Sequence, residues 1–417
     1  MTALLRLYKA VSAVALPFAA RRQLARIRGA GFSAYRAHER LGHATAERPL
    51  GKLIWLHGAS VGEAKSTLQL IPRLISQGAQ VVLTSGTATS AQAVADRLPE
   101  GVIHQFAPLD GAGPMRRFLD HWRPDLCVLI ESELWPILLT QTAERGIPVA
   151  LLNARLSDDS AKGWKRFPGT AQHVMRGIRY AHAQDVRTRN HLRDLGLDFA
   201  RHGLNLKSVQ GPPLIKSETL QAARDAIGQR ALWVAASTHP GEEEIVLAAH
   251  RMLRKSLPDL LLILVPRHPE RADDIAKLID LPFSTRSTGA PLNETSAVYL
   301  ADTMGETDLW YALSPIVFLG GSLTPVGGHT PFEPAAAGCA ILHGPLYANF
   351  AEVYRAFQTA GASLEIEDTN SLAKEVGRLL EHPSKAQSLA MAAEPLAQAG
   401  LDGLDRIASD LLGLIHD

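Results

Sequence analysis

The sequence has few cysteines and almost no net charge. Only two of its 417 residues are cysteines, and its formal net charge at pH 7 is +1. Cys127 and Cys339 both lie in apolar runs. Such positions are typical of buried thiols in a reducing compartment and predict neither a disulfide nor a metal-binding pair. A charge this close to zero argues against a general nucleic-acid-binding protein, which needs a basic surface.

The chain also has no low-complexity tract and no obvious short repeat. Its N-terminal part departs from neutrality, since residues 1–48 contain nine Lys or Arg against two Asp or Glu. The apolar run here is too short and too charged to predict a membrane span, and no small-residue cleavage site follows it. One face of the predicted helix is apolar and contains Leu4, Leu7, Tyr8, Val11, Val14, Ala15 and Phe18.

This N-terminal pattern has two interpretations. An amphipathic helix followed by Arg21, Arg22, Arg26 and Arg28 fits the anionic cytoplasmic face of a membrane. The alternative is an ordinary amphipathic helix that packs on the protein itself. We expect residues 1–35 to associate with a membrane surface.

From Leu53 onward the chain alternates strand-like and helix-like segments, with a break near residues 211–213. The alternation predicts parallel sheets with right-handed crossovers. We therefore predict an α/β protein with two doubly wound Rossmann-like domains, at 36–210 and 211–417, which face a ligand cleft. The predicted strands are Leu53–His57, Gln80–Thr84, Leu126–Glu131, Pro148–Asn153, Ala231–Ala236, Leu260–Val265, Ala297–Leu300 and Ile316–Leu319. The predicted helices are Ser60–Leu74, Ala88–Arg97, Leu134–Glu144, Glu242–Leu253, Arg271–Leu278 and Leu309–Leu313.

A glycine-rich loop follows the last of these strands. Phe318 to Glu333 reads as strand, loop and short helix, with Thr330 as the predicted N-cap and Pro331 at the first helical position. A helix N-terminus behind such a loop presents free N–H groups to an anion such as a phosphate. The alternative is that Thr330 and Glu333 form only a capping box.

Two strand-end loops in the first half contain carboxylates. Glu63 follows the first strand and has capping-box spacing from Ser60, so it is predicted either as a cap or as a general base. Glu131 and Glu133 flank Ser132 at the end of an apolar strand, where a carboxylate is costly unless it is solvated or paired, and this favours a position facing the cleft. Arg155 in the next strand-end loop has a guanidinium that can bind an anion, or it lies in an ordinary surface loop.

Three strand-end loops in the second half contain polar and cationic residues. They are residues 237–242, 266–271 and 302–306, and together with the glycine-rich loop they predict a site for a nucleotide-linked anion at one edge of the sheet. His239, His268 and His329 lack the close ligand pairs of zinc sites, so we do not predict a metal.

Seven motifs, in this order, resemble the family of 3-deoxy-D-manno-octulosonic acid (Kdo) transferases: SVGE, ESELWP, NARLS, STHPGEEE, PRHPER, DTMGE and GGSLTPVGGHTPFEP. The resemblance extends from the region of Tyr8 to about Gly361. It implies a GT-B fold and transfer of Kdo from CMP-Kdo to a lipid A precursor (lipid IVA) in lipopolysaccharide synthesis. It also implies action at the cytoplasmic face of the inner membrane, with inversion and without a metal or other cofactor.

The resemblance implies roles for particular residues as well. Glu63 matches the general base of the family, and Glu131 and Lys207 match residues that stabilise the transition state. The residues that match the CMP site are Pro266, Arg267, Met304, Gly305, Glu306, Thr330, Pro331, Phe332 and Glu333. In the family Glu333 holds the ribose, so this role and capping remain alternative predictions for its carboxylate.

The chain departs from the family pattern at four points. Asn is usual at Thr330, Phe-Asp at Ser208-Val209, Arg at Asp159 and Gly at Ala301. These departures concern the acceptor and the number of sugars transferred more than the donor. Two other functions fit the same residues: a GT-B transferase that uses another nucleotide sugar, such as a UDP-hexosamine, and a non-catalytic paralogue that binds nucleotide or lipid.

Overall fold

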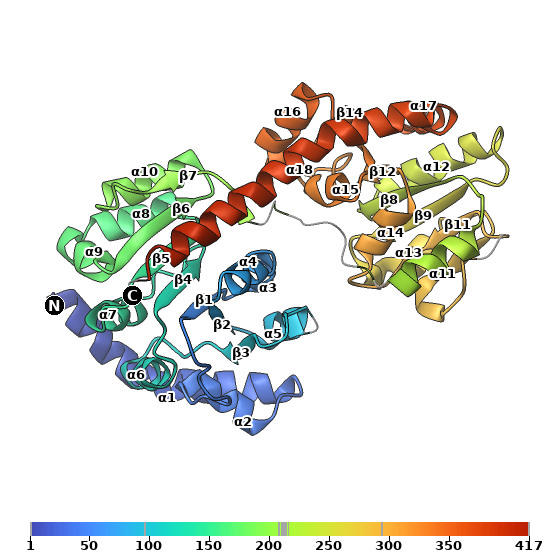
Figure 1. Cartoon of the computed structure of the whole chain (residues 1–417). Helices are drawn as coiled ribbons and strands as arrows, with labels where there is room; N and C mark the ends of the chain where they lie inside the picture. Colours follow the sequence, from blue (N-terminus) through green and yellow to red (C-terminus); the bar gives the residue numbers. More distant parts are fainter. Residues whose placement is uncertain are drawn as a thin grey trace. The chain divides into compact units, whose positions relative to one another are not determined.

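The protein is described by a computed structural model that covers residues 2–95, 97–206, 209, 215, 217–292 and 295–415 (Figure 1). The chain forms two compact units. Unit 1 comprises Met1–Val209 and Asp402–Asp417, and unit 2 comprises Gln210–Leu401. Each unit contains one seven-stranded sheet with helices around it, so the predicted pair of doubly wound α/β domains is confirmed.

The sheet of unit 1 is parallel throughout its described pairs, in the order β3-β2-β1-β4-β5-β6-β7. The first strand, β1, lies inside the sheet; β2 and β3 follow on one side of it, and β4 to β7 follow on the other side. The boundary between β1 and β4 is therefore the topological switch point, where α/β proteins bind ligands. The strands are β1 (Leu53–His57), β2 (Gln80–Ser85), β3 (Ile103–Phe106), β4 (Leu126–Ile130), β5 (Val149–Ala154), β6 (Ile178–Ala183) and β7 (Arg201–His202).

The sheet of unit 2 has a related order, β10-β11-β9-β8-β12-β13-β14, in which β11 lies between β10 and β9. Its described strand pairs are also parallel, and its switch point lies between β8 and β12. The strands are β8 (Leu232–Thr238), β9 (Leu261–Pro266), β10 (Phe283–Thr285), β11 (Val298–Leu300), β12 (Ile316–Leu319), β13 (Ala340–His343) and β14 (Ser363–Glu365).

Helices connect the strands in both units. Those of unit 1 are α1 (Ala3–Gly29), α2 (Ala34–Ala37), α3 (Val61–Ser66), α4 (Ile71–Ser76), α5 (Ala88–Ala95), α6 (Ala112–Trp122), α7 (Pro136–Glu144), α8 (Asp158–Lys165), α9 (Pro168–Met175) and α10 (Val186–Asp194). Unit 2 contains α11 (Ser217–Ile227), α12 (Glu242–Arg254), α13 (Ala272–Ala276), α14 (Thr307–Leu313), α15 (Phe332–Ala336), α16 (Ala351–Thr359) and α17 (Thr369–Glu381). The last helix, α18 (Pro383–Leu412), contributes residues to both units.

The central strands are buried along their whole length, which explains their continuous apolar sequences. Every residue of β1, β4, β5 and β12 is buried. Helices cover both faces of such parallel sheets, so no face alternates between core and solvent. Trp55 and Trp122 are fully buried in the core of unit 1, and Trp233 and Phe318 are fully buried in that of unit 2.

Two sequence predictions about chain organisation differ from the structure. The predicted helix Ser60–Leu74 is two helices, α3 and α4, because the i→i+4 pattern of bonds gives way to turns between residues 67 and 70. The predicted second domain extended to residue 417, but Asp402–Asp417 belongs to unit 1. Leu404, Ile407 and Leu411 of this segment are buried, which accounts for its association with that core.

The N-terminal helix α1 is longer than the predicted apolar run and has two distinct apolar faces. Leu5 is buried and the Tyr8 hydroxyl donates a hydrogen bond of 2.8 Å to Asp110, so one face packs on unit 1. The opposite stripe is exposed and contains Leu4, Leu7, Val11, Val14 and Phe18.

The length of α1 bears on the membrane prediction. The sequence run was predicted to be too short for a span, but α1 continues through Pro17 to Gly29, 27 residues in all. Among the described residues it is the helix that is long and apolar enough to cross a membrane, by length and composition.

Candidate active site

Glu63 lies in the first turn of α3, directly after β1 at the switch point of unit 1. Its carboxylate accepts hydrogen bonds from the Ala59 N–H at 2.9 Å and the Ser60 hydroxyl at 2.7 Å, and Ser60 Oγ accepts from the Glu63 N–H at 3.3 Å. Gly58 is required here, since a Cβ at this position would lie 2.8 Å from the Ala64 nitrogen. The Ser60 half of the predicted capping box therefore exists, but the Glu63 carboxylate accepts from the Ala59 N–H and not from that of Ser60. The role of Glu63 as a base stays a prediction.

Glu131 follows β4 across the same switch point and has a left-handed backbone with φ of 63°. Non-glycine residues rarely adopt this conformation, and such strain concentrates at functional sites. The Gln184 amide donates to Glu131 Oε1 at 3.3 Å and to the Asn153 carbonyl at 3.1 Å. Gln184 thus links the Glu131 carboxylate to Asn153 near the end of β5.

Asn153 extends this network toward the predicted lysine. It is fully buried, has φ of 53°, and its Oδ1 accepts a hydrogen bond of 3.2 Å from the Leu206 N–H. Lys207, the predicted transition-state residue, lies outside the described residues. The network therefore reaches the residue immediately before it. The sequence motif NARLS identified this strand end, but not the role of Asn153 or Gln184.

Glu133, the second carboxylate at this strand end, pairs with a histidine that was not predicted. Glu133 Oε2 lies 3.3 Å from His57 Nε2 and also accepts a hydrogen bond from the Trp135 indole. His57 contacts Thr84 Oγ1 at 2.9 Å. Burial favours the neutral acid, but the hydrogen bond and charge of His57 outweigh it and lower the pKa of Glu133. The Glu133 carboxylate is therefore engaged by His57, the last residue of β1.

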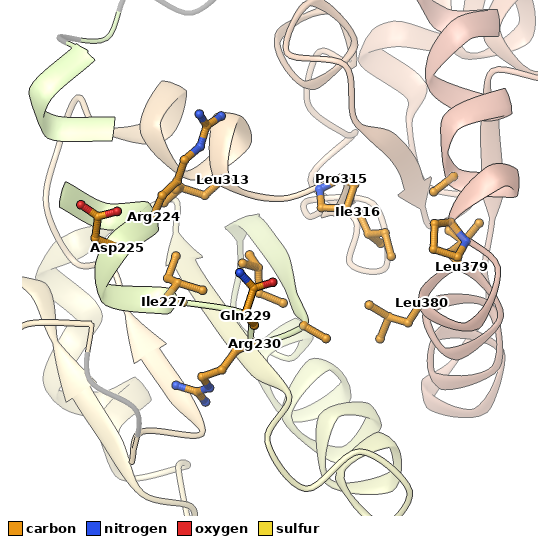
Figure 2. Close-up of a pocket in the computed structure, with 15 residues that line it drawn as sticks. Arg224, Asp225, Ile227, Gln229, Arg230, Leu313, Pro315, Ile316, Leu379 and Leu380 are labelled. Atoms are coloured by element: carbon orange, nitrogen blue, oxygen red, sulfur yellow. The ribbon is translucent and has the colours of Figure 1, made fainter. Parts of the chain in front are cut away.

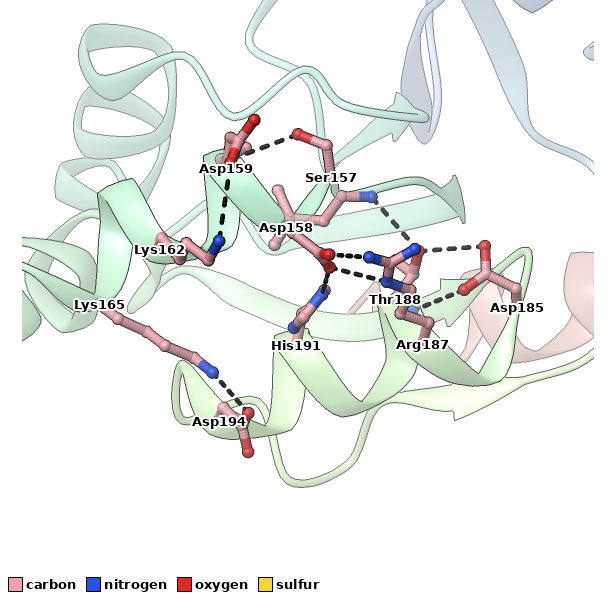
Figure 3. A network of polar contacts seen from close by, with 12 residues as sticks. Ser157, Asp158, Asp159, Lys162, Lys165, Asp185, Arg187, Thr188, His191 and Asp194 are labelled. Carbon is pink, nitrogen blue, oxygen red and sulfur yellow. Dashed lines mark hydrogen bonds and ion pairs between the residues drawn. The ribbon is translucent and has the colours of Figure 1, made fainter.

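In the region around Arg155, its guanidinium has no partner among the described residues, whereas nearby cations are paired. Ser132 Oγ donates to the Arg155 carbonyl, which fixes its backbone near Glu131, while its side chain is exposed. Figure 3 shows that Asp158, at the start of α8, faces Arg187 and His191 of α10. The Arg187 Nε–Asp158 Oδ1 and His191 Nε2–Asp158 Oδ1 distances are 2.7 and 2.8 Å. These contacts fasten α8 to α10 and engage Arg187.

In unit 2, a buried carboxylate occupies the glycine-rich loop. Glu242 Oε2 accepts hydrogen bonds from the N–H groups of His239 and Gly321 at 3.0 and 2.7 Å. Its Oε1 accepts from Ser322 and Leu323 at 3.0 and 2.8 Å. The N–H groups of Gly321, Ser322 and Leu323 are therefore engaged by Glu242 of the protein itself. The predicted anion site at the N-terminus of the following helix stays a prediction.

Cationic and imidazole side chains gather at the same switch point. His239 follows β8, Arg267 follows β9, and His329 follows the glycine-rich loop after β12. The His239 and His329 Nε2 atoms are 3.0 Å apart, and the His268 ring centroid lies 5.6 Å from that of His239. The structure thus brings together the glycine-rich loop and two of the three predicted strand-end loops, residues 237–242 and 266–271. Within the described residues no group of three or more His, Cys, Asp or Glu side chains is arranged to hold a metal ion.

Arg271 of the same motif is not available to a ligand. It forms a bidentate pair with Glu243, which is fully buried, at 2.8 and 3.3 Å. Arg267 is exposed, and its guanidinium has no hydrogen-bond partner in the part of the chain that the structure describes. Of the two arginines in this loop, Arg267 is therefore the one placed to meet an anion.

The loop before α14 is held by residues that the sequence analysis missed. Arg286 binds Glu306 in a bidentate pair at 3.0 and 2.6 Å, and this contact lowers the pKa of the Glu306 carboxyl. Ser287 donates to both oxygens of Asp302. Gly305 has φ of 87°, and Met304 is 68% exposed at the tip of the loop. An exposed methionine on a braced loop is suited to contact a flat ligand ring.

The helix after the glycine-rich loop begins one residue later than predicted. Pro331 is the N-cap of α15 and makes no side-chain cap, while Thr330 Oγ1 accepts from the Phe332 N–H at 3.4 Å. Phe332 packs edge-on against Phe357 at 5.5 Å between ring centroids, so its ring faces the core. Glu333 lies in the first turn of α15, and its predicted role remains a prediction.

A large cavity lies at the opposite edge of the same sheet. Figure 2 shows this cavity of about 730 Å³, which is lined by Leu232 at the start of β8, Ile316 at the start of β12, and Arg224 and Arg230. The predicted donor residues follow the other ends of these strands. The cavity is therefore separate from the switch point.

Structural comparisons define the class of fold. The chain is similar to the UDP-GlcNAc 2-epimerase of Neisseria meningitidis, with a TM-score of 0.58, 14% identity and coverage of 87% of this chain and 99% of the other. A glycosyltransferase of Rickettsia africae gives a TM-score of 0.55 at 13% identity, with coverage of 87% and 99%. These likenesses, with the two parallel sheets, show the GT-B fold.

Sequence comparisons narrow the class to one family. A family model described as 3-deoxy-D-manno-octulosonic-acid transferase (kdotransferase) matches residues 35–209. The 3-deoxy-D-manno-octulosonic acid transferase of Haemophilus influenzae is 35% identical over 382 residues, 89% of this chain and 88% of the relative. A probable mitochondrial transferase of this kind from Arabidopsis thaliana is 33% identical, with coverage of 83% and 81%. The chain belongs to the 3-deoxy-D-manno-octulosonic acid transferase family, as the resemblance predicted.

Proposed function

We propose that the protein is an inverting, metal-independent glycosyltransferase that moves Kdo from CMP-Kdo to lipid IVA in lipopolysaccharide synthesis. One observation carries the proposal beyond family membership. The switch point of unit 1 has the carboxylates Glu63 and Glu131, whereas that of unit 2 has Arg267 and the histidines. A sugar transfer needs both: a base for the attacking hydroxyl and positive charge for the departing phosphate.

The reaction is a single displacement. Glu63 accepts the proton of the acceptor hydroxyl as its oxygen attacks the anomeric carbon of Kdo. The bond from that carbon to the phosphate oxygen breaks, its electron pair stays with the phosphate, and CMP leaves. A single in-line attack inverts the anomeric configuration. Glu131 stabilises positive charge that develops on the sugar ring, and Lys207 stabilises negative charge on the leaving group.

The donor is held by the strand-end loops of unit 2. Arg267 meets the phosphate, because it is exposed and its guanidinium suits a bidentate contact. The loop of Met304, Gly305 and Glu306 packs along the cytosine ring. Pro266 and residues 330–333 complete the CMP site, with Glu333 at the ribose.

The acceptor is an acylated phospho-sugar, which accounts for the surface of α1. Its exposed stripe of Leu7, Val11, Val14 and Phe18 lies in the acyl region of the cytoplasmic leaflet of the inner membrane. The arginines at 21, 22, 26 and 28 contact anionic headgroups there. The acceptor hydroxyl then reaches Glu63 at the membrane surface.

A transfer assay tests the proposal. The purified chain is mixed with CMP-Kdo generated in situ and with lipid IVA, and the products are weighed by mass spectrometry. We expect the mass of the acceptor to rise by whole Kdo units, and Glu63→Ala to lose about 10²-fold or more of the rate. Transfer from a UDP-sugar but not from CMP-Kdo, or CMP binding without any transfer, would contradict the proposal.

A further inference from the structure

His239 and His329 form a close imidazole pair whose role no motif predicted. Their rings are nearly parallel and meet edge to edge, with planes 15° apart, centroids 5.2 Å apart and Nε2 atoms 3.0 Å apart. Only 9% of His239 is exposed. Gly321, with φ of 66°, makes room for the pair, since a Cβ there would lie 2.9 Å from the His329 ring. The loop sequence therefore accommodates this contact specifically.

The charged groups around the pair are mostly cations. Arg267, His268 and Arg271 face it from the loop after β9, and Arg271 is neutralised by Glu243. Glu242 faces it from α12, but all four of its hydrogen bonds come from backbone N–H groups of this loop region. The pair thus has no carboxylate partner of its own among the described residues.

These surroundings keep both imidazoles neutral. Burial, together with His239, Arg267 and His268, lowers the pKa of His329 to about 4. Burial, His268 and the two arginines likewise lower the pKa of His239. At neutral pH one ring therefore donates its Nε2–H to the bare Nε2 of the other. The donor ring is left with a bare Nδ1.

This hydrogen bond sets how many protons the pair can accept. One proton can join the bare Nδ1 of the donor ring, which becomes an imidazolium and keeps the contact. A second proton would place hydrogens on both Nε2 atoms and break the contact. The pair can therefore bind one additional proton, and a negative charge nearby favours this protonation.

We propose that His239 and His329 receive the phosphate monoester of the nucleotide and take up one proton as it binds. The inference rests on the donor role proposed above for this edge of unit 2. A phosphate dianion that contacts Arg267 reverses the local field and favours the imidazolium. The charged ring then donates a hydrogen bond to a phosphate oxygen. During transfer this contact stabilises the negative charge on CMP, the leaving group.

Isothermal titration calorimetry of the full-length chain with CMP tests this inference. The titration is repeated at pH 6.5 in buffers with different ionisation enthalpies, because the slope of heat against that enthalpy counts the protons taken up. The phosphate of CMP also titrates near this pH, so the informative quantity is the difference between variants. We expect His329→Gln or His239→Gln to reduce the uptake by about half a proton or more relative to the native chain.

His268→Gln is the matched control, because it removes a neighbouring imidazole and leaves the pair intact. We expect it to retain the uptake of the native chain. The inference is overturned if both pair variants bind CMP with the native uptake, or if only His268→Gln reduces it. CMP binding with the same proton uptake in the native chain and both pair variants overturns the pair but leaves the donor site, whereas no CMP binding by the native chain overturns both. Thermal unfolding of the two pair variants checks that each folds.

Discussion

The two sheets are both parallel and seven-stranded, and each has a switch point beside its first strand, but the chemistry at the two switch points is opposite. In unit 1, Glu63, Glu131 and Glu133 follow the strands at this point, and the cation Arg155 is exposed after the next strand. In unit 2 the carboxylates Glu242 and Glu243 are completely buried and fully engaged, and Arg267 and three histidines gather there.

This difference shows that the strands determine the fold, whereas the loops after them determine the chemistry. Buried apolar strands build both sheets, and either sheet offers a crevice at its switch point. The loop residues then decide what that crevice does. A crevice with carboxylates can remove a proton from a hydroxyl, and a crevice with cations can hold a phosphate. Substitutions at either point test whether these tasks are divided between the units.

The largest effect is expected for Glu131→Gln. This change keeps the side-chain shape and an oxygen that accepts from Gln184, but it removes the charge. We expect kcat for Kdo transfer to fall about 10²- to 10³-fold, as for the loss of one electrostatic group in a transition state. CMP affinity measured by calorimetry should stay unchanged, since the donor belongs to unit 2.

Glu133→Gln is the matched control for Glu131. Its carboxylate is engaged by His57 and Trp135, so a smaller loss of kcat is expected. Equal losses in the two variants would remove the distinction between the two carboxylates. A weaker affinity for CMP in either variant would count against the division of tasks.

Glu242→Gln tests the buried carboxylate of unit 2. Its oxygens accept four backbone hydrogen bonds, and an amide group in this place leaves part of those donors unsatisfied. We expect a loss of about 3 kcal/mol in stability, seen as lower hydrogen-exchange protection of β8 and β12. Glu244→Gln on the same helix is exposed and should change protection little. Unchanged protection in Glu242→Gln would show that the loop does not depend on this carboxylate.

Acidification should destabilise unit 2 more than unit 1. The pKa of His329 is about 4 and that of His250 about 3, both lowered first by burial. The folded state therefore binds fewer protons than the unfolded chain, and stability falls as the pH drops below about 6.5, by about 2 kcal/mol per histidine at pH 5.

Unit 1 has compensating groups. His104, with a pKa of about 4, has the same sign, but burial raises the pKa of Glu39 and Asp110. These two carboxyls bind protons earlier in the folded state, so they add stability as the pH falls. Hydrogen exchange at pH 7 and pH 5, corrected for intrinsic rates, measures the two units separately. Equal losses in both units would contradict this expectation.

The smallest effect is expected for Gln184→Met. Methionine keeps the volume but removes the amide that donates to Glu131 and to the Asn153 carbonyl. We expect kcat to fall about tenfold with little change in KM, since a hydrogen bond to a charged group contributes about 1.5–3 kcal/mol. Gln221→Met on the exposed α11 is the control. A change in KM alone would show that Gln184 affects binding of substrate and not Glu131.

Much of the fold could be predicted because it depends on local apolar patterns. The predicted strands Leu53–His57 and Ile316–Leu319 have the same bounds in the structure. Edge strands such as β7 and β10 are short and partly exposed, so they leave little apolar signal. The C-terminal part of α18 could not be assigned to unit 1, because a buried stripe on a helix does not identify the core that covers it.

The chemistry of the site was predictable by residue type but not by partner. The motifs identified Glu63, Glu131 and Arg267. They did not show that Glu242 occupies the glycine-rich loop or that Gln184 contacts Glu131, because residues 79 and 53 positions apart meet only in the folded chain. The positive φ of Glu131 is likewise set by its surroundings, since local sequence disfavours it for a glutamate.

The central claim is that Glu63 of unit 1 is the general base for the acceptor hydroxyl. The rate of Kdo transfer tests this claim most directly. The transfer rate at saturating CMP-Kdo is compared for the native chain, Glu63→Gln and Ser60→Ala, since Ser60 shares the capping contacts of Glu63. The account predicts a fall of about 10²-fold or more for Glu63→Gln and of less than about tenfold for Ser60→Ala. Equal falls in the two variants, or a native rate in Glu63→Gln, would mean that Glu63 only caps its helix.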